Sequence, residues 1–216
     1  MSSTTRIAPN DGLEIGMRKT LREMNDLELV SFHEAGHAVL EYLLGYSIIL
    51  IVVDPSEAGG SCSADRISDD RFCIRQLQSL PESGKQVLIY CGGYAAESIL
   101  THSRIRWRSS PDYHRAFKEL LPVYQDKKLI ANYIESMWHW AKALLKEYWW
   151  VVEALADALI WRSEETNNEE WYGSDMEDEL PIDFYKSEAC LRVMDGLEAE
   201  EVISRALTQN WGADGS

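Results

Sequence analysis

Apolar residues recur at helical spacing over most of the chain, and this pattern predicts a mainly helical protein. One run, YSIILIVVD at 46–54, is β-branched and too short for a buried helix, so it predicts a strand. Pro55 ends that run, and residues 55–65 are expected to form a loop. The predicted fold class is therefore α+β, mainly α, with a small β-sheet. The helices that the pattern predicts cover residues 14–24, 25–44, 69–79, 81–100, 110–121, 127–161 and 196–207.

Residues at the predicted helix ends support these boundaries. Asn25 or Asp26 can cap the second helix, and Gly45 can end it. Pro81 suits a first helical position, and a serine followed by Pro111 marks a further helix start. The long stretch at 127–161 is expected to form one or two helices, whose apolar stripe is most simply explained as core.

The composition is that of a globular protein with an uneven charge. The chain has 216 residues, of which 45% are hydrophobic, so it can bury the core of one good-sized domain. Its formal net charge is −15, and residues 164–201 carry most of it, with 14 acidic residues against Lys186 and Arg192. So acidic a chain is not expected to bind nucleic acid or an anionic membrane.

The charge distribution also suggests how the chain is divided. We expect an N-terminal segment at 1–24, a domain at 25–163, and an acidic C-terminal segment with a terminal helix at 164–216. A charge run is usually a solvated face, so the last segment is expected to affect solubility or regulation more than chemistry.

Neither a disulfide framework nor a targeting segment is expected. The four cysteines, Cys62, Cys73, Cys91 and Cys190, are widely separated and form no CxxC pair. The start, MSSTTRIAPNDG, does not resemble a secretory signal, and the longest aliphatic run, IILIVV, is far shorter than a bilayer span. These features predict a cytoplasmic protein with reduced thiols and no membrane segment.

Three ionisable residues interrupt the apolar helix predicted at 25–44. His33 and His37 are four positions apart, so on a helix they share a face and can point their imidazoles at one ion. Neutral imidazole suits Zn²⁺, and Glu34 projects beside such an ion, where it can deprotonate zinc-activated water. The pattern predicts a zinc site with His33 and His37 as ligands and Glu34 as the general base.

A simpler interpretation is a pair of satisfied core histidines that happen to lie four positions apart. It is less favoured, because burying two imidazoles and a carboxylate in an apolar helix without a shared partner is costly. A hydrolytic zinc site also needs a third protein ligand and an open fourth position. The residues alone leave that ligand open among His102, His114, His139 and several carboxylates.

The motifs HEAGHAV at 33–39 and GGYAAE at 92–97, with a strand between them and an aspartate at a later helix start, resemble the FtsH-type zinc metalloproteases. The resemblance is to the peptidase domain of that family and covers roughly residues 25–165. It implies a zincin-like helical domain with a small sheet beside the HExxH helix, zinc as the cofactor and a polypeptide as the substrate. It assigns the third zinc ligand to Asp112, with Glu97 as the second choice.

Other roles are open for the residues that the resemblance singles out. A carboxylate in a first helical turn, such as Asp112, is favourable with the helix dipole alone. Glu97 can orient a histidine rather than bind the metal. Gly92 and Gly93 cost about 1 kcal/mol each in a helix relative to alanine, which close packing on the zinc helix would offset. A break in the helix is the competing explanation.

Three differences separate the chain from the family pattern. Tyr94 replaces the arginine that usually precedes AAE, and RWRSSP replaces the small residues and asparagine that usually approach the aspartate. No GxxxxGK[ST] nucleotide-binding motif occurs, and the membrane anchors of the family are missing too. We therefore expect a stand-alone peptidase domain that acts without an ATPase motor.

Two functions fit these observations. The first is an ATP-independent zinc metalloendopeptidase that hydrolyses flexible or unfolded polypeptide. The second is a catalytically silent, zinc-stabilised binding or regulatory protein whose acidic segment contacts a basic protein partner. Glu34 favours the first, because a purely structural zinc site needs no base. Whether the chain forms a homo-oligomer is left open.

The strand predicted at 46–54 is expected to bind the substrate. In zinc proteases of this kind the strand beside the metal presents an open edge, to which an extended chain adds by main-chain hydrogen bonds. No Lys or Pro blunts this edge before Pro55, and two glycines beyond it would let another backbone come close. The residues expected to contact the substrate are Ile48, Ile49, Leu50, Ile51, Val52, Val53, Gly59 and Gly60.

Overall fold

The computed structural model describes residues 26–54, 59–66, 73–103, 110–161 and 192–211. These residues form helices around one small antiparallel sheet, which confirms the predicted α+β, mainly α class. The segment expected to be helical at 14–24 and most of the acidic run lie outside the described residues. The elements, in chain order, are α1 (Asp26–Leu43), β1 (Tyr46–Asp54), β2 (Gly59–Arg66), α2 (Arg75–Gln78), α3 (Glu82–Tyr90), α4 (Gly92–Leu100), α5 (Pro111–Leu120), α6 (Lys127–Glu147), α7 (Trp149–Trp161), β3 (Arg192–Asp195) and α8 (Gly196–Trp211).

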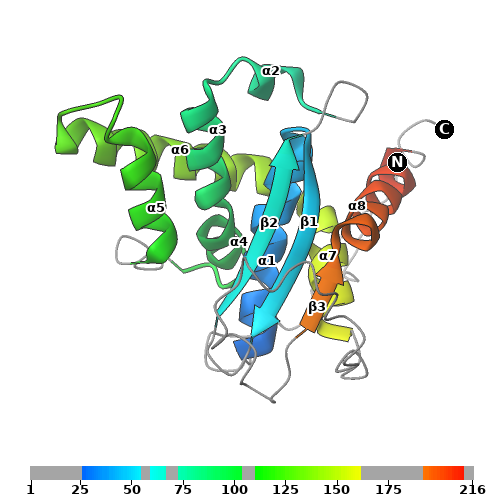
Figure 1. Ribbon diagram of the computed structural model, residues 1–216. Coiled ribbons are helices and arrows are strands. Elements are labelled where there is room, and N and C mark those ends of the chain that lie inside the picture. Colours follow the sequence, from blue (N-terminus) through cyan, green and yellow to red (C-terminus); the bar gives the residue numbers. More distant parts are fainter. Residues whose placement is uncertain (1–25, 55–58, 67–72, 104–109, 162–191, 212–216) are drawn as a thin grey trace, which may run out of the picture.

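Helix α1 lies at the centre of the fold. Figure 1 shows it crossing behind β1 and β2, with α3 to α6 on one side and α7 and α8 on the other. Its core-facing residues Ala35, Ala38 and Val39 are completely buried. The helix ends as predicted before Gly45, whose φ of 83° is a left-handed conformation that glycine adopts at low cost. The chain then turns directly into β1.

Strand β1 is the centre of the three-stranded sheet, whose order is β2-β1-β3 with both pairs antiparallel. Strand β2 pairs with it from Tyr46 to Asp54, and β3 pairs with it from Leu50 to Val53. Where β3 does not reach, Glu200 of α8 accepts a hydrogen bond from the main-chain N–H of Ile48. The expectation of an open edge on this strand is therefore wrong, because neighbouring elements cover both sides. The residues concerned are Ile48, Ile49, Leu50, Ile51, Val52 and Val53.

A loop was expected at residues 55–65, and that expectation is wrong for residues 59–65, which belong to β2. Its sequence, GGSCSADR, lacks the β-branched and aromatic residues that favour strands, so pairing with β1 rather than propensity makes it extended. Within the described part of the chain, β2 is an edge strand, with β1 as its one sheet partner. Gly59 and Gly60, which were expected to contact the substrate, lie on this strand.

The single helix expected at 81–100 is broken at Cys91 into α3 and α4. The break next to Gly92 is the competing explanation that the sequence left open for the two glycines. The long stretch at 127–161 forms two helices, α6 and α7, as the sequence allowed. No helix in the described ranges has both the length and the apolar character needed to cross a membrane.

The C-terminal elements β3 and α8 share one core with α1 and β1. Helix α8 packs against α7 and β1, and Met194 and Ile203 are completely buried. A Cβ at Gly196 would lie 1.6 Å from the carbonyl oxygen of Ile48, so α8 and β1 approach as closely as a glycine allows. The boundary expected after residue 163 lies outside the described residues. Beyond it, residues 192–211 complete the sheet and its covering layer.

Candidate metal centre

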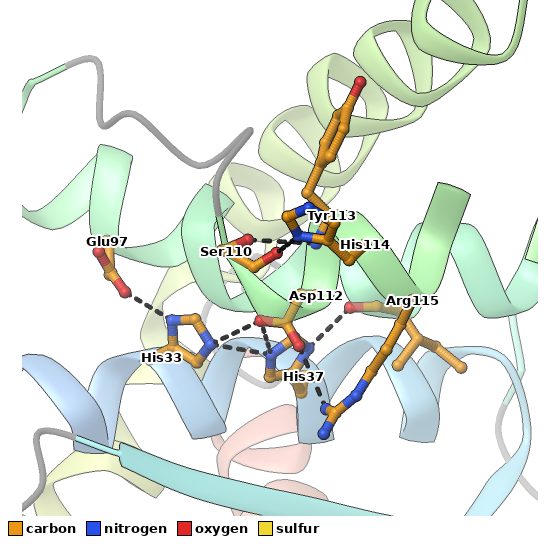
Figure 2. Close-up of polar contacts among 9 residues, drawn as sticks. His33, His37, Glu97, Ser110, Asp112, Tyr113, His114 and Arg115 are labelled. Carbon is orange, nitrogen blue, oxygen red and sulfur yellow. Dashed lines mark hydrogen bonds and ion pairs between the residues drawn. The ribbon is translucent and has the colours of Figure 1, made fainter. Parts of the chain in front are cut away.

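Two helices bring the predicted ligands together. His33 and His37 lie on consecutive turns of α1, and Figure 2 shows both imidazoles pointing towards the start of α5. There Ser110 caps the helix by accepting a hydrogen bond from the N–H of Tyr113, and Pro111 occupies the first turn. This local structure directs the buried Asp112 carboxylate at the two imidazoles.

The donor atoms of His33, His37 and Asp112 form a compact triangle. Nε2 of His33 lies 3.1 Å from Nε2 of His37 and 3.2 Å from Oδ2 of Asp112, and Nε2 of His37 lies 3.6 Å from the same oxygen. A tetrahedral zinc ion with bonds of about 2.0–2.1 Å needs ligand atoms about 3.3–3.4 Å apart. The three observed distances bracket that range. Among the described residues, these three have donor atoms close enough to share one ion.

The other nitrogen of each imidazole has its own hydrogen-bond partner. Nδ1 of His37 donates to the carbonyl of Ile89 at 2.7 Å, and Nδ1 of His33 donates to Oε1 of Glu97 at 2.5 Å. These bonds place a proton on Nδ1 and leave the lone pair of Nε2 for a metal. Glu97 therefore lies on the side of His33 away from the triangle, where it orients the ring. The geometry favours Asp112 over Glu97 as the third ligand.

The charges at the triangle attract a cation. Burial alone would lower the pKa of His33, but hydrogen bonds to Asp112 and Glu97 outweigh it and raise that pKa to about 10. Burial opposes ionisation of Asp112 as well, yet the two imidazoles hold its pKa well below the usual range. In the absence of a metal ion, these side chains therefore bind protons tightly. A divalent ion would displace those protons and would be attracted by the same negative charge.

Glu34 is buried beside the triangle, between α1 and β2. Burial raises the pKa of its carboxyl group, and the nearby imidazoles of His37 and His33 partly oppose that rise. A Cβ at Gly60 would lie 2.7 Å from Oε1 of Glu34 and 2.6 Å from the carbonyl oxygen of Val52. Glycine at position 60 therefore makes room for both the Glu34 side chain and the pairing of β2 with β1.

Helix α4 approaches α1 through glycines. A Cβ at Gly36 would lie 2.6 Å from the carbonyl oxygen of Gly92, and a Cβ at Gly92 would lie 2.7 Å from that of Gly36. At Gly93 a Cβ would lie 2.3 Å from Nε2 of His33. Two explanations were proposed for Gly92 and Gly93: close packing of their helix on α1, and a helix break. Both features occur in the structure.

A cavity of about 440 Å³ opens onto the metal group. Its walls come from α1, β2, α3, α4 and α5, so it follows one face of α1 along the edge strand. Tyr94 lines this cavity and packs edge-on against His33, with ring centroids 4.8 Å apart. It stands where the FtsH-type motif usually has an arginine. Arg115 lies at the cavity too, with its guanidinium 3.4 Å from Oδ1 of Asp112 (Figure 2).

The other histidines do not join the group. His102 follows α4 and is exposed, and His139 pairs on the surface with Glu135. Nδ1 of His114 donates at 2.6 Å to the carbonyl of Ser110, the residue that caps its own helix.

Glu41 and Cys62 are among the cavity-wall residues that were not identified as such beforehand. Glu41 follows His37 by four positions, so the same helical spacing that identified the histidines could have indicated it. Cys62 lies on the strand that was expected to be a loop, and no sequence signal placed it beside α1.

No protein-family model matches the chain. Among curated proteins, the ATP-dependent zinc metalloprotease FtsH 1 of Petrotoga mobilis is 29% identical over 131 residues, which cover 53% of this chain and 19% of that protein. The chain therefore spans about a fifth of the length of the curated relative that it matches. Similarity at this level supports a relationship to a zinc metalloprotease and assigns the chain to no family.

Proposed function

We propose that the protein is a zinc metalloendopeptidase that hydrolyses flexible or unfolded polypeptide without ATP. The main support is the fit of three donor atoms, from His33, His37 and Asp112, to the spacing that a tetrahedral zinc ion requires. A zinc ion held there would act as a Lewis acid and lower the pKa of a water molecule towards neutrality.

Glu34 moves the protons of the reaction. Its buried carboxylate lies within the cavity wall beside both imidazoles, and burial raises its pKa above the usual range of a glutamate, which helps a group that must both accept and release a proton. It takes a proton from the attacking water and delivers it to the leaving amine. Glu97 and the carbonyl of Ile89 keep the two imidazoles in the tautomer that a metal needs.

The edge strand β2, rather than β1, is where we place the substrate. Residues 60–64 line the cavity, and the outer edge of β2 has no strand partner within the described residues. An extended peptide can add to this edge through main-chain hydrogen bonds, which tolerate many side chains but require a locally unfolded chain. Compact domains are therefore expected to resist cleavage.

Proteolysis of one protein in two states tests this proposal. The zinc-loaded protein is incubated with a stable folded domain and with the same domain permanently unfolded, each with and without ATP and with and without a chelator. We expect cleavage of the unfolded form alone, independent of ATP and abolished by the chelator. Equal cleavage of both forms, or cleavage only with ATP, would contradict the proposal. Zinc binding without cleavage of any form would favour the catalytically silent binding protein.

A further inference from the structure

Glu41 is a buried acid in the cavity for which the proposed chemistry has no use. It lies one helical turn beyond His37, and only 6% of its surface is exposed. Its Oε2 accepts a hydrogen bond from the thiol of Cys62 at 2.9 Å. Its Oε1 makes no hydrogen bond with the described residues. A buried carboxylate with one weak thiol donor is poorly compensated, since thiols are weak hydrogen-bond donors.

The charged and titratable groups that act on Glu41 include no lysine or arginine. They are the Cys62 thiol, His37, Glu34 and the Tyr90 hydroxyl, and burial is the main reason that the pKa of Glu41 is raised. Arg115, which also lines the cavity, is paired with Asp112. The His37 imidazole favours the charged carboxylate, but His37 belongs to the metal group, and no lysine or arginine of the described residues pairs with Glu41. A ligand in the cavity could supply such a cation.

The position of Glu41 fixes which part of a bound peptide it would meet. One helical turn separates it from His37, about 5–6 Å, and an extended peptide advances about 3.3 Å per residue, so Glu41 lies about two residues from the scissile bond. Glu34 packs on Gly60 and Glu41 contacts Cys62, which means that α1 and β2 run in the same direction. A peptide paired antiparallel with β2 would therefore place its N-terminal part at Glu41.

We propose that Glu41 forms an acidic subsite that binds the lysine or arginine side chain of a substrate, about two residues on the N-terminal side of the cleaved bond. This inference rests on the proposed function for the position of the scissile bond. The aliphatic stem of such a side chain can lie along the cavity wall while its charged end reaches the carboxylate. Oε1 of Glu41 would accept the hydrogen bond from this charged end, and the Cys62 thiol would keep Oε2.

Quenched fluorescent peptides of one unstructured sequence test the subsite, with a single lysine at successive positions and norleucine in its place as the uncharged match. We expect the lysine peptide to have a kcat/KM at least about tenfold higher than its norleucine match, as for close charge pairs in a desolvated interface. Moving the lysine by one residue should move the cleaved bond by one residue. Glu41→Gln should remove the preference, and Glu201→Gln, on the exposed surface of α8, should keep it. Equal rates for both peptides, or a preference that survives Glu41→Gln, would overturn the inference.

A binding measurement separates this inference from the proposed function. Fluorescence anisotropy of the same peptides is recorded with the zinc-loaded Glu34→Gln protein and with Glu34→Gln/Glu41→Gln. Tighter binding of the lysine peptide that disappears in the double variant would support the subsite, whether or not the wild-type protein cleaves any peptide. An absence of cleavage by the wild-type protein would contradict only the proposed function. Cleavage without any charge preference in rate or binding would overturn the subsite and leave the proposed function standing.

Discussion

Replacing Gly93 by alanine tests whether the close packing of α4 on α1 positions the metal ligands. The added Cβ would lie 2.3 Å from Nε2 of His33 and 2.5 Å from two ring carbons. Unbonded heavy atoms settle about 3.5 Å apart or more, so the imidazole or the helix must withdraw by about 1 Å. The obstructed atom is the one expected to bind zinc.

Such a displacement is large for a metal ligand but modest for the fold. Zinc–ligand distances vary by only about 0.2 Å, so a ring moved by about 1 Å is misplaced, and we expect zinc affinity to fall at least about 100-fold. Overpacking costs about 1–3 kcal/mol of unfolding free energy, and alanine returns about 1 kcal/mol of helix propensity. The metal-free variant should therefore be at most about 2 kcal/mol less stable than the metal-free parent.

The assay is competition for zinc against a chromophoric chelator, with urea unfolding of both proteins in excess chelator. Gly84→Ala is the matched control, because it also adds a methyl group near a helix start. Its nearest neighbours are the hydroxyl oxygen of Tyr133 at 3.0 Å and the ring of Pro81 at 3.4 Å, away from the metal group. Gly84→Ala should bind zinc like the parent. If Gly93→Ala also binds zinc like the parent, His33 is not held against α4 as described.

Zinc retention, proton release and truncation test three other features of the structure. Asp112→Ala should lose zinc on dialysis more readily than Glu97→Ala, because Asp112 faces both Nε2 atoms while Glu97 only orients His33; the reverse order would make Glu97 the ligand. Zinc binding at neutral pH should release protons, because the raised pKa values of His33 and His37 mean that protons compete with the metal for both rings. For the same reason, zinc affinity should rise with pH towards about 10, the pKa of His33. Zinc binding without proton release in weakly buffered solution would contradict this. Ending the chain at residue 191 should prevent folding, because it removes the buried side chains of Met194 and Ile203, whose burial stabilises the fold by about 1.5–3 kcal/mol each. Urea unfolding measures this effect. A truncated protein as stable as the parent would show that β3 and α8 are dispensable.

The central helix and strand could be predicted because their own residues determine them. The apolar spacing of α1, the β-branched run of β1 and the glycine between them each point to the observed structure. Strand β2 could not be predicted, since GGSCSADR becomes extended only by pairing with β1. Strand β3 has four residues, too few for a recognisable alternation, and follows a run of acidic residues. The error about the open edge of β1 followed from these two omissions.

The candidate site shows a similar division. Spacing along one helix was enough to group His33, Glu34 and His37, because α1 alone sets their geometry. The choice between Asp112 and Glu97 depends on which ring nitrogen of His33 each carboxylate meets, and that is a property of helix packing. Glu41 shares the helical spacing of the histidines, but its contact with Cys62 depends on a strand that the sequence did not reveal.

The Glu34→Gln variant tests the central claim most directly. It is measured for bound zinc and for cleavage of a permanently unfolded polypeptide, beside the parent protein. An amide has nearly the shape of the carboxylate but cannot take a proton from water, so the variant should bind about one zinc per chain and cleave nothing. A variant that binds zinc and cleaves at the parental rate would contradict the assignment of Glu34 as the base, and with it the hydrolytic site proposed for this fold.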